Sequence, residues 1–137
     1  MSDRTSKNKA LMRRVYEEMW NEGKTALARE LFARPEGVER FVSQFLVSFP
    51  DLQHTVEAMI AEGDQVAVSF SARGTHSGQW SGFAPTGRSI QYTGVTLARI
   101  AGNRILEHHT WWDRAALLEQ LGGGAPGGVH SLIDSQK

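Results

Sequence analysis

Apolar residues in the first part of the chain recur every three to four positions. Leu11, Val15 and Met19 show this spacing, which places their side chains on one face of an α-helix. Gly23 ends this helix, because glycine is favoured directly after a helix C-terminus. The same period, interrupted by glycine and proline, predicts helices in succession over residues 4–22, 25–32 and 38–48.

In the rest of the chain the apolar period changes from 3.6 to 2, as Val66, Val68 and Phe70 show. Such alternation is typical of strands that bury one face. It predicts strands over residues 54–61, 65–76, 89–100 and 104–112. Short turn sequences at 62–64 and 101–103 contain glycine with Asp or Asn, which indicates hairpins between antiparallel strands.

The last predicted strand carries the residues best suited to chemistry. His108, Thr110 and Trp112 share one face of it, because successive strand side chains point to opposite sides. Asp113 follows directly, before an apolar segment. Its carboxylate can accept hydrogen bonds from free backbone N–H groups, so we expect it to be the N-cap of a helix over 114–121.

The order of helices first and strands afterwards predicts an α+β fold, with N-terminal helices packed on a strongly curved antiparallel sheet. A cavity between the two layers is a common place for a ligand. The length of 137 residues fits one domain, which we expect over residues 1–122. The remaining residues, 123–137, are rich in glycine and polar residues and predict a flexible tail.

Charge and composition narrow the classes of partner. Lys plus Arg and Asp plus Glu each number 15, so the formal net charge is zero. This balance argues against nucleic acid as a partner and makes self-association plausible. The first residues are polar, and no apolar run approaches the roughly 20 residues that span a bilayer. We therefore expect a cytoplasmic protein without membrane contact.

Histidine is the main candidate for acid–base chemistry. His108 is the best placed, since an imidazole titrates near neutral pH; the alternative is a packed histidine whose hydrogen bonds are satisfied. None of the histidines stands at a recognised metal-ligand spacing with a carboxylate, and the adjacent His109 points away from His108. We therefore expect no metal site. Asp113 is favoured as a helix cap over a general base.

Aromatic residues supply the candidate ligand contacts. Trp80 and Phe83 lie in the glycine-rich loop 74–87, where apolar side chains often act as a lid or an interface anchor. Aromatic residues at helix and strand spacing are usually core residues, yet they can also line a pocket. The residues predicted to contact a ligand are Tyr16, Trp20, Trp80, Phe83, Tyr92, Thr96, Thr110 and Trp112.

Several segments resemble the SnoaL-like polyketide cyclase family of the NTF2-like superfamily. They cover most of residues 8–122 and include NKALMRRVYEEMWNEG, the pattern G-T-H-x-G…G-x-x-P-T-G, and the strand end E-H…W-D. The resemblance implies a cone of helices and curved sheet, an apolar pocket, a homodimer, and no cofactor or metal. Family members usually have a longer segment after Phe32, so this pocket is either more open at one end or its loop is shortened for another purpose.

Polyketide cyclases of that family close a ring by intramolecular aldol condensation, with a pocket aspartate as acid–base beside a histidine and an amide. The resemblance places the aspartate at Thr110, the histidine at Thr96 and the amide at Gly94, and a further histidine is retained as His108. A threonine hydroxyl cannot serve as the base, because its pKa is far above neutrality. We therefore expect the standard aldol activity to be absent or very weak.

These observations favour a small-molecule domain whose ligand is a planar or polycyclic molecule of polyketide or terpenoid kind. If it is an enzyme, a cofactor-independent cyclase or isomerase that uses His108 fits best. The alternative is a non-catalytic ligand-binding or dimerisation module. A third hypothesis is hydration or isomerisation by a relocated carboxylate, for which Glu17, Glu57 and Asp113 are the candidates. We expect a homodimer built on the outer face of the sheet.

Overall fold

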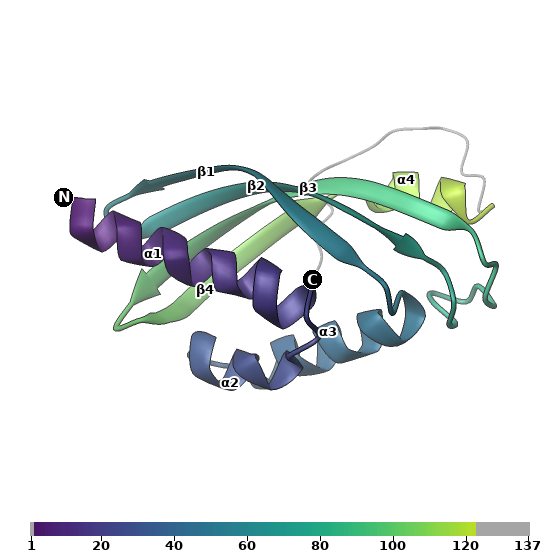
Figure 1. Cartoon of the computed structure of the whole chain (residues 1–137), viewed down its shortest axis with the longest axis horizontal. Helices are drawn as coiled ribbons and strands as arrows, with labels where there is room; N and C mark the ends of the chain where they lie inside the picture. Colours follow the sequence, from purple (N-terminus) through teal and green to yellow (C-terminus); the bar gives the residue numbers. More distant parts are fainter. Residues whose placement is uncertain (1, 123–137) are drawn as a thin grey trace.

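Helices cover one face of a curved sheet in this protein (Figure 1). The computed structural model describes residues 2–122, so the predicted tail 123–137 lies outside the described residues. The sheet has four antiparallel strands in the order β1-β2-β3-β4, and the N-terminal helices all lie on the same side of it. The predicted α+β arrangement is confirmed.

The first predicted helix is present but changes its geometry halfway. Its first part is α-helical, and Val15–Trp20 then forms wider π-helical turns, whereas the apolar spacing predicts one regular α-helix. The third helix begins two residues earlier than predicted, since the Pro35 carbonyl already accepts from the Glu39 N–H at 2.8 Å. The helical elements are α1 Ser2–Arg14, η1 Val15–Trp20, η2 Thr25–Leu27, α2 Ala28–Leu31 and α3 Glu36–Ser48.

The strands agree with their predicted bounds to within a residue at each end. They are β1 Gln53–Glu62, β2 Gln65–Thr75, β3 Ser89–Ala101 and β4 Arg104–Trp112, followed by α4 Arg114–Gln120. Gly102 and Asn103 both have positive φ, at 58° and 62°, as the tight hairpin turn between β3 and β4 requires. Asp113 caps α4 as predicted, because its side chain accepts from the Ala116 N–H at 3.0 Å.

Two β-bulges decide which side chains face the helices. The register of β4 shifts at Leu106, so that Ile105 and His108, three positions apart, both face the cavity beneath the helices. A second shift occurs at Glu57 in β1. An extra residue in one strand changes the side to which all later residues point. Simple alternation from Ile105 would have turned His108 outward.

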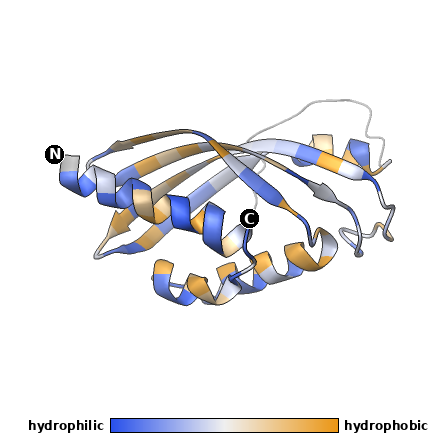
Figure 2. Cartoon of the chain, viewed as in Figure 1, coloured by the Kyte–Doolittle hydropathy of each residue, from blue (hydrophilic) through white to orange (hydrophobic). Residues whose placement is uncertain are grey.

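The core lies between the inner face of the sheet and the helices. Figure 2 shows hydrophobic and hydrophilic positions alternating along these elements. The inward residues of β2, such as Val66 and Val68, are fully buried, and so are Met12, Met19 and Phe49 from the helical side. Packing of this kind holds the helices against the sheet and leaves room for a cavity toward α3.

Candidate functional site

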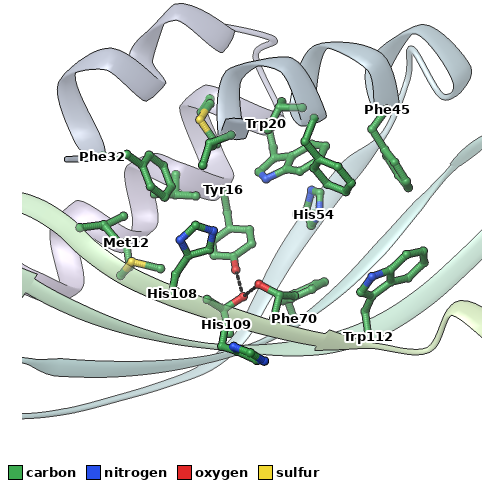
Figure 3. A pocket seen from close by; sticks show the side chains of 18 of the residues that line it. Met12, Tyr16, Trp20, Phe32, Phe45, His54, Phe70, His108, His109 and Trp112 are labelled. Atoms are coloured by element: carbon green, nitrogen blue, oxygen red, sulfur yellow. Dashed lines mark hydrogen bonds between the residues drawn. The ribbon is translucent and has the colours of Figure 1, made fainter. Parts of the chain in front are cut away.

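A cavity of about 720 Å³ lies between the helices and the inner face of the sheet. Its walls are mainly aromatic and aliphatic, with a few polar groups among them. Ligand sites in proteins typically occupy about 300–1,000 Å³ and have this mixed character. Figure 3 shows its aromatic side chains converging from helices and strands. The cavity is therefore the candidate site for a small molecule.

Most of the residues predicted from the sequence surround this one cavity. Those that line it are Tyr16, Trp20, Tyr92, Thr96, His108, Thr110 and Trp112. Trp80 and Phe83 are not among the lining residues of the described chain. Trp80 packs behind the wall instead, with ring centroids 6.4 Å from Trp112, and Phe83 is paired with it through two backbone hydrogen bonds. Any direct contact of these two with a ligand stays a prediction.

A chain of hydrogen-bonded hydroxyls runs along the sheet side of the cavity. The Tyr16 hydroxyl is 2.6 Å from Thr96 Oγ1, which in turn is 2.8 Å from Thr110 Oγ1 (Figure 3). Thr96 and Thr110 are cross-strand partners in β3 and β4, and η1 brings Tyr16 to them. The two positions that the family resemblance marks for histidine and aspartate therefore meet, and both carry hydroxyls.

The hydroxyls of this site stay protonated. Burial raises the pKa of Tyr16 above its ordinary value, partly opposed by the hydrogen bond with Thr96. Burial also raises the pKa of Tyr92, and the neighbouring Tyr16 adds to that effect. A low-polarity environment disfavours the charged form of a phenol. Both groups can therefore donate hydrogen bonds to a ligand oxygen, but neither can act as a base near neutral pH.

His108 is the cavity's candidate for proton transfer. Its ring packs edge-on against Phe32, with centroids 5.2 Å apart. The His108 side chain remains exposed, and its partial burial, with the neighbouring His109 as a smaller cause, lowers its pKa; this favours the neutral imidazole, which can accept a proton. The ring of His109 lies on the opposite side of β4 (Figure 3), tilted against Trp111 with centroids 4.5 Å apart, and part of His109 also borders the cavity.

His54 lines the cavity although it is not among the site residues predicted from the sequence. It lies at the start of β1, is 7 % exposed, and its ring nitrogen Nδ1 is buried without a hydrogen-bond partner. Burial lowers the pKa of His54 to about 3, so the ring is neutral at all physiological pH values. Alternation along β1 offered a weak signal, since His54 and Val56 share a face, but nothing local indicated a cavity there.

No acidic side chain lines the cavity within residues 2–122. The three carboxylates considered for a relocated acid–base role are engaged elsewhere. Glu17 pairs with Arg13 at 3.0 Å on the surface, and the Glu57 carboxylate accepts from Ser71 Oγ at 2.8 Å. Asp113 caps α4. The relocated-carboxylate hypothesis therefore has no support in the geometry of these candidates.

The short segment after Phe32 forms one side of the cavity. Phe32 pairs with Ile105 as an isolated bridge, and Arg34 donates to the Leu106 carbonyl at 3.2 Å. Arg34 and Phe41 both line the cavity while remaining exposed, Phe41 to 51 %. The cavity therefore meets solvent between this segment and α3, and Arg34 is the only Lys, Arg, Asp or Glu side chain that lines it within residues 2–122.

Metal-ligand clusters and membrane-spanning helices are both missing from the described residues. No cluster of three or more His, Cys, Asp or Glu side chains occurs there with a geometry for binding a metal ion. The helices of residues 2–122 are also all too short or too polar to cross a bilayer.

The curved sheet, its helical cover and the cavity between them define an α+β cone of the NTF2-like class. A family model for the SnoaL-like polyketide cyclases matches residues 10–121. The chain belongs to this family. Among curated proteins, none matches the chain significantly.

Solved structures agree with this assignment. IdmH of Streptomyces antibioticus, provisionally assigned as a polyketide cyclase, is 32 % identical with a TM-score of 0.72, covering 84 % of this chain and 98 % of its own. A SnoaL-like protein of Jannaschia sp. CCS1 is 23 % identical with a TM-score of 0.82, covering 91 % and 98 %. AclR of Streptomyces galilaeus, provisionally assigned as a hydroxylase, is 23 % identical with a TM-score of 0.79, covering 88 % and 99 %. One fold thus carries more than one provisional activity, and the reaction must be argued from the site.

Proposed function

We propose that the cavity binds a planar or polycyclic, mainly apolar molecule of polyketide or terpenoid kind. We further propose that His108 moves a proton in a cofactor-independent ring closure or isomerisation of that molecule. One observation carries this proposal: His108 and the hydroxyl chain of Tyr16, Thr96 and Thr110 line the same apolar cavity. A base beside hydrogen-bond donors suits removal of a proton next to a carbonyl group.

The proposed chemistry assigns a role to each group. Neutral His108 takes a proton from the carbon next to a ligand carbonyl. The electron pair of the broken C–H bond forms a C=C bond, and the π pair of the carbonyl moves onto its oxygen. Hydroxyls of the site donate hydrogen bonds to the oxygen as its negative charge develops. Return of the proton from His108 to another carbon completes an isomerisation, which is the outcome we expect of this site. Ring closure by attack of the enolate carbon on a second carbonyl, with the His108 proton passing to the new alkoxide, is the aldol step, and we expect it to be weak with Thr110 in place of a carboxylate.

A non-catalytic binding or dimerisation module is the second candidate, and a specific observation favours it. Thr110 stands where the family's aldol chemistry needs a carboxylate, and none of the cavity-lining residues within 2–122 is acidic. Loss of a general base typically lowers a rate by a factor of about 10² to 10⁴. The cavity would then serve to hold the apolar molecule, without transforming it.

Proton exchange in a probe molecule separates these two functions. The bicyclic ketone 2-tetralone has exchangeable protons beside its carbonyl, and their replacement in D₂O can be followed by NMR. We expect the natural protein to accelerate this exchange over buffer, and His108→Gln to remove about 10²-fold or more of the acceleration. Binding of 2-tetralone without acceleration would overturn the catalytic proposal and support the binding module.

The aldol reaction itself needs a separate assay. Polyketide methyl esters would be offered to the natural protein and to Thr110→Asp. We expect little or no ring closure by the natural protein, and a gain with Thr110→Asp if the cavity accepts the substrate. Robust closure by the natural protein would contradict the argument from Thr110.

We also propose a homodimer built on the outer face of the sheet. Ile60, Val95, Leu97 and Leu106 are large apolar side chains exposed by 37 % or more. Ile60 and Leu97 are both cross-strand partners of Ala67, so their side chains form one row across the outer face. The zero net charge does not oppose self-association. A second copy of the chain would remove these side chains from water.

A further inference from the structure

The imidazole of His54 is a polar group embedded among aromatic rings at the cavity wall. Its ring centroid lies 4.8 Å from Trp20, 5.3 Å from Phe70 and 5.4 Å from Tyr16. His54 lines the cavity, yet its Nδ1 atom is buried without a hydrogen-bond partner. Figure 3 shows it on the other side of the Tyr16 ring from His108. Neither the hydroxyl chain nor His108 therefore supplies a hydrogen-bond partner for Nδ1 of His54.

The side chain of Asn21 holds the backbone of His54 at both its N–H and its carbonyl. Its N–H donates to Asn21 Oδ1 at 2.7 Å, and its carbonyl accepts from Asn21 Nδ2 at 2.9 Å. Asn21 follows η1 directly, and its own N–H donates to the Tyr16 carbonyl at 3.0 Å, which is the wide hydrogen bond of a π-helical turn. The π-helical segment thus places Tyr16 and Trp20 at the His54 ring and Asn21 at the His54 backbone. Turns of this kind are frequent at functional sites.

Buried polar atoms nearly always have a partner, so an exception calls for an explanation. His76 is a useful comparison, because it also has an unpartnered buried ring nitrogen, Nε2. Its Nδ1, however, accepts from the Thr86 N–H at 3.2 Å, and His76 does not line the cavity. His76 therefore stabilises the loop that contains Thr86. His54 differs in having an anchored backbone and a ring that borders a space large enough for a ligand.

We infer that His54 is a recognition residue of the cavity, hydrogen-bonding a neutral hydroxyl or carbonyl group on the bound molecule. This inference rests on the proposed function and specifies the ligand further. A neutral imidazole has one donor and one acceptor nitrogen, which suits either oxygen group. An ionised carboxylate is unsuited to this position, because the aromatic rings around His54 offer no positive charge to replace its water.

Naphthalene probes test this inference without the natural ligand. The probes are 2-naphthol, which carries a neutral hydroxyl, 2-methylnaphthalene, which has nearly the same shape but no polar group, and 2-naphthoate, which is anionic. Dissociation constants would be measured by fluorescence for the natural protein and for His54→Phe, which keeps an aromatic ring and loses both nitrogens. We expect His54→Phe to weaken 2-naphthol about 3- to 10-fold and to leave 2-methylnaphthalene unchanged or tighter. We expect 2-naphthoate to bind the natural protein more weakly than 2-naphthol.

A second measurement does not depend on the variant folding. In ¹⁵N-labelled natural protein, the ring nitrogen resonances of His54 should move on addition of 2-naphthol and stay in place with 2-methylnaphthalene. Equal loss of both probes in His54→Phe would reduce His54 to a packing residue and overturn the inference. No loss of either, or unmoved resonances, would overturn it as well. If neither neutral probe binds the natural protein, the proposed function fails, and this inference fails with it.

Discussion

Thr96 is the middle member of the hydroxyl chain, so Thr96→Val removes both of its hydrogen bonds in one step. Valine has nearly the same shape and the same branching at Cβ. The change deletes the 2.6 Å contact with Tyr16 and the 2.8 Å contact with Thr110. Tyr16 is only 4 % exposed, so its hydroxyl would be left in the core without its partner.

The expected magnitudes follow from which groups lose their partners. Tyr16→Phe removes one hydrogen bond and leaves Thr96 bonded to Thr110, so it should lower the free energy of unfolding by about 1 kcal/mol. Thr96→Val also strands the buried phenol, which costs about 1–3 kcal/mol. In the double variant no stranded phenol remains. The loss in free energy of unfolding of the double variant should therefore be smaller than the sum of the two single-variant losses by about 1 kcal/mol.

Urea unfolding of the natural protein, both single variants and the double variant measures this coupling, provided that the slope m stays constant. Thr93→Val is the matched control, because Thr93 lies exposed on the outer side of the same strand and should change stability by less than about 0.5 kcal/mol. Additive losses to within about 0.3 kcal/mol would refute the reasoning. A loss for Thr96→Val no larger than that of the control would refute it too.

Three further predictions concern other parts of the molecule. Burial lowers the pKa of His54 to about 3, so below about pH 6.5 the unfolded chain binds a proton that the folded protein does not bind. The free energy of unfolding should therefore fall with decreasing pH, and His54→Phe should reduce this pH dependence by about 1.4 kcal/mol per pH unit between pH 6 and 4, measured by urea unfolding. Gly94→Ala should lower the stability of the protein by about 1–3 kcal/mol in thermal unfolding, because a Cβ there would lie 2.6 Å from Phe70 Cζ. Gly37→Ala is the control and should not destabilise the protein, since the space around Gly37 is open. Leu97→Glu should convert the proposed dimer to a monomer in light scattering; an unchanged mass would argue against the outer face as the interface.

Much of the fold was predictable because helices and strands have different apolar periods. The alternation of Val66, Val68 and Phe70 marks an inward face, and these residues are indeed buried. The Gly102-Asn103 turn was also readable, since those residue types tolerate positive φ. The π-helical turns of η1 were not readable, because Leu11, Val15 and Met19 satisfy an ordinary helical spacing equally well.

The candidate site was predictable only in part. Strand parity and the family resemblance predict that Thr96 in β3 and Trp112, beyond the bulge of β4, line the cavity, and they do line it. The glycine-rich loop predicts that Trp80 and Phe83 cover the pocket, yet the structure packs Trp80 behind the cavity wall. A loop sequence indicates freedom of the backbone, but it does not indicate which side of a wall the loop will meet.

By itself the sequence determined the elements, the layer order and the family, because these depend on local periodicity and on motifs within short segments. Tertiary structure alone decided which polar groups meet. Tyr16 and Thr96 are 80 residues apart, and their hydrogen bond exists only because η1 packs against the sheet and brings the Tyr16 hydroxyl to β3. The bulge at Leu106 likewise turns His108 inward through pairing with β3. Such contacts are set by packing between distant segments, and that packing also leaves His54 at the cavity wall without a partner for Nδ1.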